Sequence, residues 1–199
     1  MHHTKLLRHI GFGPATGSAG CIPAAALAAI IALSHPAMGQ SLGGPVAEVR
    51  FGVLSHDVPG LWSGFNREGS RIALNGEVLF RPHLTILGGT LRPALGGTIA
   101  TGGGTSKAYL DARWEIESRS GLFLALGLGA AVHNGNLAPT DPNRKSLGSR
   151  LLYHIPLEIG WRWDGRQSVS VYFDHISNGY SRRFNEGLDT LGLRYGYRF

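Results

Sequence analysis

The sequence predicts an all-β protein, namely an eight-stranded antiparallel transmembrane β-barrel. Three observations lead to this fold class. Charged residues make up only 16% of the 199 residues, whereas a soluble domain usually has about a quarter. Glycine is abundant, with 30 residues, but lacks the three-residue period of collagen. Apolar and polar residues alternate with the two-residue period of β-strands over many short segments.

The first 39 residues have the features of a secretory signal peptide, so we place them outside the fold. They include basic but no acidic residues, and an apolar run over 22–33 precedes the small-x-small cleavage site Ala37-Met38-Gly39. The run is shorter than the roughly 20 residues of a membrane-spanning helix. The only cysteine, Cys21, lies before this run, whereas a lipoprotein box follows one. We therefore expect a mature barrel domain over 40–199 that has no disulfide.

The charge of the mature chain is modest. Removing Lys5 and Arg8 from the 19 basic residues leaves 17 against 13 acidic ones, which lowers the formal net charge from +6 to +4. This positive excess suits contact with phosphorylated lipid head groups. No nucleic acid is expected as a partner, because an exported protein rarely meets any.

Eight segments of the mature chain alternate as β-strands do. They are 45–55, 71–81, 83–92, 106–118, 121–133, 149–163, 166–178 and 188–199. Tight turns and long connections alternate between them; the turns are Arg81-Pro82, Arg119-Ser120 and Asp164-Gly165, and the long connections are 56–70, 93–105, 134–148 and 179–187. Membrane barrels have such short periplasmic turns and longer extracellular loops, and charges recur opposite the apolar rows as they would in a barrel interior.

A soluble β-sandwich or lipocalin would also alternate, but the end of the chain favours a membrane barrel. Trp161, Trp163, Tyr195 and Tyr197 lie near strand ends, where barrels have aromatic girdles. The ending Tyr-Gly-Tyr-Arg-Phe, with Phe199 last, resembles the signal that the assembly machinery of bacterial outer membranes recognises. These features predict a protein of the Gram-negative outer membrane, in contact with outer-membrane lipids.

Three polar side chains interrupt the predicted lipid-facing rows. His175 and Ser177 share one face because residues i and i+2 of a strand do, and Asp189 begins the last strand on its outer face. Such groups are costly in hydrocarbon unless paired, so we expect them to meet. Ser177 would be a nucleophile, His175 its base and Asp189 the orienting acid. Asn178, or backbone N–H groups of Gly179-Tyr180, would donate to the oxyanion. The competing interpretation is ordinary polar residues at a membrane interface.

These residues also carry a resemblance to a family. The stretches His175-Ile176-Ser177-Asn178-Gly179 and Asn185-Glu186-Gly187-Leu188-Asp189, with the barrel-type ending, are similar to the outer-membrane lipid A 3-O-deacylases, the PagL family. The resemblance implies hydrolysis of the ester-linked 3-hydroxyacyl chain at the 3-position of lipid A in lipopolysaccharide, with no metal or other cofactor. It places the acid at Asp189, where better-known members carry Glu. Glu186 is the alternative acid.

Several other residues could have a role, and the sequence allows two other functions. We interpret His56, His83, His133 and His154 as structural, because they lack metal-ligand spacing, and Gly102-Gly103-Gly104 as a flexible loop. Arg182 and Arg183 suit lipid A phosphates or a solvated loop equally well. An outer-membrane phospholipid esterase and a non-enzymatic structural or adhesion barrel are the alternatives. The sequence leaves open whether the barrel forms a homodimer.

Overall fold

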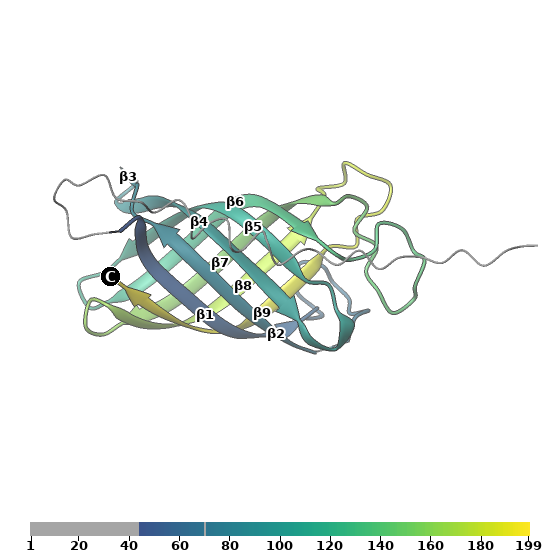
Figure 1. Ribbon diagram of the computed structural model, residues 1–199, viewed down its shortest axis with the longest axis horizontal. Coiled ribbons are helices and arrows are strands. Elements are labelled where there is room, and N and C mark those ends of the chain that lie inside the picture. Colours follow the sequence, from purple (N-terminus) through teal and green to yellow (C-terminus); the bar gives the residue numbers. More distant parts are fainter. Residues whose placement is uncertain (1–43, 70) are drawn as a thin grey trace, which may run out of the picture. The chain divides into compact units, whose positions relative to one another are not determined.

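The computed structural model describes residues 44–69 and 71–199, and Figure 1 shows their strands arranged as a barrel. The predicted signal peptide, 1–39, with Cys21, lies outside the described residues. No helix in the described part of the chain is long and apolar enough to cross a membrane.

Eight long antiparallel strands and one short strand form the sheet. They are β1 (Val46–His56), β2 (Arg71–Phe80), β3 (Leu84–Ile86), β4 (Gly89–Ala100), β5 (Lys107–Glu117), β6 (Leu122–His133), β7 (Leu151–Arg162), β8 (Gln167–Ser177) and β9 (Leu188–Arg198). Pairing of β1 with β9 and of β2 with β4 closes the sheet on itself. The eight-stranded antiparallel barrel predicted from the sequence is therefore confirmed.

The predicted third strand, 83–92, and the predicted turn Arg81-Pro82 are wrong. β3 continues the line of β2, because β2 pairs with the second half of β4 and β3 pairs with its beginning. The hairpin turn is Leu87-Gly88, where both residues have positive φ, 50° and 71°, as a type I′ turn requires. Pro82 lies in the irregular stretch between β2 and β3.

The predicted loop 93–105 is correspondingly too long, because its first eight residues belong to β4. Pro93 and the pair Gly96-Gly97 are residue types that are unfavourable inside strands, yet all three lie within β4. Gly96 has a packing reason to be in the strand, since a Cβ there would lie 2.5 Å from the ring of Tyr109 on β5. The other seven predicted strands agree with the structure within two residues at each end.

Charged side chains fill the interior of the barrel. Glu158 accepts hydrogen bonds of 2.6 Å from Arg50, Arg113 and Ser170, and Arg194 donates to Glu77 at 3.0 Å. Burying a charge is costly unless partners compensate, and these pairs supply that compensation. Apolar side chains such as those of β6 and β9 project outward and are exposed, as expected of a surface that faces lipid.

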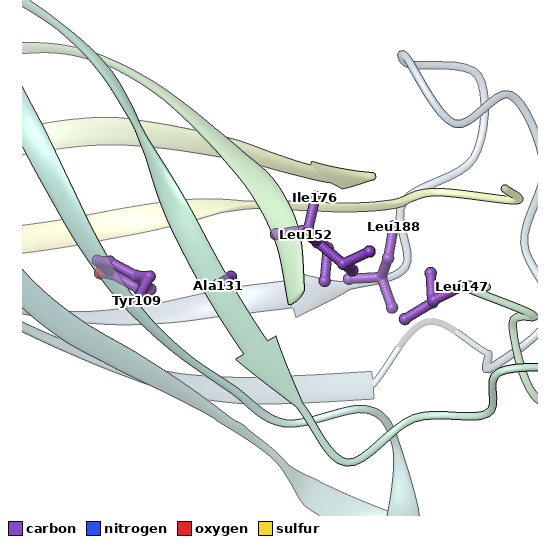
Figure 2. Packing of buried hydrophobic residues seen from close by; sticks show 6 residues of the cluster. All are labelled: Tyr109, Ala131, Leu147, Leu152, Ile176 and Leu188. Carbon is purple, nitrogen blue, oxygen red and sulfur yellow. The ribbon is translucent and has the colours of Figure 1, made fainter. Parts of the chain in front are cut away.

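A small apolar cluster lies inside the barrel near the ends of β8 and β9, as Figure 2 shows. Its members are Tyr109, Ala131, Leu147, Leu152, Ile176 and Leu188. Ile176 and Leu188 are cross-strand partners and are fully buried. Because side chains alternate along a strand, their inward position turns His175, Ser177 and Asp189 to the outer face. The cluster thus fixes the strand ends that carry the candidate site.

Candidate active site

His175 on β8 and Asp189 on β9 lie directly opposite each other in the sheet. The Nδ1 atom of His175 is 2.6 Å from Oδ1 of Asp189, and the two side chains are buried. Direct cross-strand pairing brings the backbones close, so the short aspartate side chain reaches the imidazole without an intervening water. The departure from Glu that the sequence shows at this position is therefore compatible with a direct contact.

The second oxygen of Asp189 is also occupied. Its Oδ2 atom accepts a hydrogen bond of 2.7 Å from the backbone N–H of Ser63, in the loop between β1 and β2. The neighbouring Trp62 stacks on the His175 ring, with 4.5 Å between ring centroids and 13° between the planes. This loop contribution was missed by the sequence analysis, since no strand periodicity extends to it.

His175, Ser177 and Asp189 lie on the outer face of the barrel, but they are covered rather than open to lipid. Val169 and Val171, on the same face of β8, are exposed, whereas His175 is 4% and Ser177 9% exposed. The covering residues are Trp62 and its neighbours in the β1–β2 loop. Shielding of this kind separates the polar groups from hydrocarbon, which removes much of the cost of placing them on a lipid-facing wall.

Ser177 and His175 line the same pocket, which has a volume of about 420 Å³. Its other walls come from the β1–β2 and β8–β9 loops: Trp62, Ser63, Phe65, Tyr180, Arg183, Phe184, Asn185, Glu186 and Gly187. Among the described residues, no hydrogen bond joins the Ser177 hydroxyl to His175. Catalytic hydrogen bonds are often long before substrate binds, so this geometry is compatible with a nucleophile and its base.

Asn178 connects the end of β8 to two loops. Its side-chain nitrogen donates to the carbonyls of Leu147 at 2.9 Å and Phe184 at 2.5 Å, and its backbone N–H donates to Oδ1 of Asn185 at 2.8 Å. Both the side-chain and the backbone donor of Asn178 are therefore engaged within the protein, whereas the alternative donors, the backbone N–H groups of Gly179-Tyr180, have no such partner among the described residues. Asn185, which the sequence analysis named only as part of a family motif and gave no role, lines the pocket and keeps its side-chain nitrogen as a free donor among the described residues.

Gly187 lines the pocket and Gly179 follows Asn178 after the end of β8; both have left-handed conformations, with φ of 61° and 59°. A Cβ on Gly187 would lie 2.9 Å from Cε1 of His175, so this glycine gives the imidazole its space. Glu186, the alternative acid, turns away from His175. It accepts from the backbone N–H of Ser146 at 2.7 Å and from Arg67 at 3.1 Å.

A buried polar network anchors the β1–β2 loop. Asp57 accepts from the backbone N–H groups of Arg67 and Glu68, both at 2.8 Å, which closes the loop on itself. Lys145, from the β6–β7 loop, lies 3.3 Å from Asp57 and donates to the Phe65 carbonyl at 2.6 Å. The loop that covers His175 and Asp189 is thus held by contacts with a second loop.

Glu68 is the centre of this network. It contacts His56 at 2.7 Å and accepts hydrogen bonds from Thr105 and from the backbone N–H of Lys145. Burial favours the protonated carboxyl, but these hydrogen bonds outweigh it and lower the pKa of Glu68 from 4.5 to about 2. A carboxylate that is ionised at neutral pH therefore ties the strand ends to the loops.

The remaining histidines have structural contacts. His133 contacts the Ser149 carbonyl at 2.7 Å, His154 contacts Asp111 at 2.8 Å, and the exposed His83 contacts the Arg81 carbonyl at 3.0 Å. Over 44–69 and 71–199 there is no cluster of three or more potential ligands that could hold a metal ion. The predicted glycine loop is in part a 3-10 turn, Thr101–Gly103.

The fold and the buried His–Asp pair beside a serine define an outer-membrane β-barrel with a candidate hydrolytic site on its outer wall. The family model described as Lipid A 3-O-deacylase (PagL) matches residues 54–198. The chain therefore belongs to this family of lipid A deacylases, which are hydrolases of the outer membrane.

A solved structure shows the same architecture. A crystal structure of the outer membrane enzyme PagL has 20% sequence identity and a TM-score of 0.58, and the match covers 77% of this chain and 100% of that one. The N-terminal β-barrel domain of Pseudomonas aeruginosa OprF matches with 12% identity and a TM-score of 0.46, over 77% of this chain and 100% of that one. A comparison with curated proteins found no match. At 20% identity the likeness to the PagL structure shows the fold alone.

Proposed function

We propose that this protein is a lipid A 3-O-deacylase in which Ser177 is the nucleophile, His175 the general base and Asp189 the acid that orients it. The observation that carries the proposal is the contact of 2.6 Å between His175 and Asp189, with Ser177 two residues away on the same face and in the same pocket. A family match over residues 54–198 supports lipid A as the substrate.

The reaction proceeds in two acyl-transfer steps. His175 takes the Ser177 proton as the hydroxyl oxygen attacks the ester carbonyl, and Asp189 stabilises the imidazolium that forms. The tetrahedral intermediate then expels the 3-hydroxyl of the sugar, which receives the proton from His175. Water, activated by the same imidazole, attacks the acyl-serine and releases the fatty acid. The enzyme returns to its starting state without a cofactor.

The oxyanion of each intermediate needs N–H donors that are preorganised. The Asn178 side chain is already bound to two carbonyls, so we assign its role to holding the loops. Backbone N–H groups of Gly179 and Tyr180 and the side-chain nitrogen of Asn185 are the donors that remain beside Ser177. They lie in the β8–β9 loop, which also forms part of the pocket wall.

The pocket has an apolar and a basic part, as a phosphorylated glycolipid would require. Phe65 and Tyr180 supply aromatic surface for an acyl chain, and Arg183 supplies a guanidinium for a phosphate. The charge of Glu186 is compensated by Arg67. Because the pocket lies on the outer face of the barrel, lipid A can reach it by lateral diffusion in the membrane.

The test is mass spectrometry of lipid A after lipopolysaccharide is incubated with detergent-purified protein. We expect loss of one 3-hydroxyacyl chain from the 3-position with wild type and no loss with Ser177→Ala. Ser181→Ala is the matched control, because Ser181 is exposed in the adjacent loop. Heat-modifiability on gels checks that each barrel is folded.

Each outcome discriminates between the proposals. Activity retained in Ser177→Ala would exclude this nucleophile, and loss of a chain from another position would exclude 3-O specificity. Release of fatty acid from phospholipids but not from lipopolysaccharide would favour the phospholipid esterase. No release from either lipid would favour a structural barrel.

A further inference from the structure

Trp62 is an aromatic residue that packs directly on the candidate catalytic histidine. Its indole lies nearly parallel to the His175 imidazole, at 13°, with 4.5 Å between centroids. One face of the indole is thus in contact with the imidazole, while the side chain as a whole remains 61% exposed.

The position of Trp62 is fixed by the same carboxylate that orients His175. The next residue, Ser63, donates its backbone N–H to Oδ2 of Asp189 at 2.7 Å, while Oδ1 contacts His175 at 2.6 Å. A further backbone contact joins Val58 to the Asp189 carbonyl at 3.1 Å. Asp189 therefore holds the imidazole edge-on with one oxygen and the loop carrying the indole with the other.

Contacts on both sides of Trp62 hold this part of the β1–β2 loop in place. Gly60 donates to the Gly64 carbonyl at 3.2 Å, and both glycines have positive φ, 76° and 79°, which makes the turn around Trp62 tight. The Lys145 ammonium lies over the Phe65 ring, 4.0 Å from its centroid. These contacts hold the loop segment that carries the indole against His175.

We propose that Trp62 is a positioning residue of the deacylation. It keeps the His175 ring in contact with Asp189 and stabilises the imidazolium form of His175. The inference rests on the proposed function. The face of an indole is the best of the aromatic faces at attracting a cation. The interaction gains most of its strength when His175 has taken the Ser177 proton, because only then does the imidazole carry a full charge.

The timing of that charge predicts which kinetic constant depends on Trp62. Substrate binds while the imidazole is neutral, so the stack contributes about equally to free and bound enzyme. The imidazolium develops in the transition state, and an interaction made only there changes kcat rather than KM. Loss of the indole should therefore lower kcat about ten- to thirtyfold, the range expected for a shielded cation–π contact.

The experiment compares Trp62→Phe with Trp62→Leu in the full-length barrel. Phenylalanine keeps an aromatic face, whereas leucine keeps apolar cover without one. We expect Trp62→Leu to lower kcat about ten- to thirtyfold at unchanged KM, and Trp62→Phe to retain kcat within about threefold of wild type. Trp163→Leu, at the opposite end of the barrel wall, is the matched control and should leave both constants unchanged. Heat-modifiability confirms folding.

A second measurement is the rate at which a small fluorophosphonate labels Ser177, since this reports the reactivity of the nucleophile without lipid binding. Slower labelling of Trp62→Leu, with recovery in Trp62→Phe, supports the inference. Faster labelling would show that Trp62 is a cover that limits access, and equal kcat in all three proteins would show that it has no role in the chemistry; both results overturn it. If wild type is not labelled by the fluorophosphonate and does not hydrolyse lipid A, the proposed function is overturned as well. This result distinguishes failure of the proposed function from failure of the inference about Trp62.

Discussion

The two carboxylate oxygens of Asp189 each accept from a different N–H group. Asparagine at this position has only one acceptor oxygen for these two donors. The donor at Oδ2 is the backbone N–H of Ser63, at 2.7 Å, and the group at Oδ1 is Nδ1 of His175, at 2.6 Å. An asparagine has one oxygen and one NH₂ group. The backbone N–H cannot become an acceptor, whereas the imidazole can change tautomer. The amide oxygen should therefore face Ser63 and the NH₂ group should face His175.

This orientation places the imidazole proton on the wrong nitrogen. When Nδ1 accepts from the asparagine, the proton of the neutral ring moves to Nε2, which can then no longer accept the Ser177 proton. The equivalent change in a Ser-His-Asp protease lowers kcat about 10⁴-fold with the geometry preserved. We expect a loss of similar size for Asp189→Asn, which corresponds to about 5 kcal/mol of transition-state stabilisation.

The assay measures initial rates of 3-hydroxy fatty acid release from lipopolysaccharide by wild type, Asp189→Asn and Glu186→Gln. Glu186 is the matched control because it contacts Ser146 and Arg67 and not His175. Glu186→Gln should keep activity within about tenfold of wild type, a change of no more than about 1.4 kcal/mol. A loss in Glu186→Gln that exceeds the loss in Asp189→Asn would refute the reasoning and move the acid into the β8–β9 loop.

Three further predictions concern the surroundings of the triad. Gly187→Ala should lower kcat at least about tenfold, because the new Cβ would lie 2.9 Å from the imidazole and the backbone has positive φ. Gly165→Ala is the control. Gly165 has φ of 73° and no neighbour within 4 Å of an added Cβ, so this variant has the backbone strain alone and should leave kcat unchanged. Arg183→Ala should raise KM about tenfold for bisphosphorylated lipid A but not for dephosphorylated lipid A; an equal rise for both substrates, or the same rise in Arg182→Ala, would exclude phosphate recognition. The folded pKa of Glu68, about 2, lies below its ordinary 4.5, so its ionised form stabilises the protein above about pH 4.5 and this contribution is lost as pH falls toward 2. Glu68→Gln should therefore unfold at a lower temperature than wild type at pH 7, and the gap should close near pH 2; a gap independent of pH would contradict the assignment.

Strand periodicity was sufficient to predict most of the barrel. Alternation also placed His175 and Ser177 on one face and Asp189 on the neighbouring strand, because two residues that are i and i+2 apart need no tertiary information. The error at β3 and β4 has a local cause. Pro82 and Pro93 look like turn residues in sequence, but the barrel accommodates both, one in an irregular stretch and one within β4.

The loop contributions to the site could not be predicted in the same way. Trp62 and Ser63 reach the triad from a connection between two other strands, and their position depends on contacts of Asp57 and Lys145 that have no sequence period. Asn178 was predicted as an oxyanion donor from its place beside Ser177. Its side chain instead bridges two loops, a geometry set by how the connections pack above the strand ends.

The opening of the pocket on the outer wall has a consequence for how turnover should be quantified. An enzyme whose cleft faces water receives its substrate from three-dimensional solution. Under the proposed function, this pocket instead receives lipid from a single leaflet of the membrane. Its substrate supply is therefore a surface density, and dilution with inert lipid or detergent should slow the reaction even when the total amount of lipopolysaccharide in the tube is constant. If the proposed function is correct, the released fatty acid should enter the same leaflet and compete there for the aromatic wall of the pocket, so that product accumulates in the membrane rather than in the surrounding water.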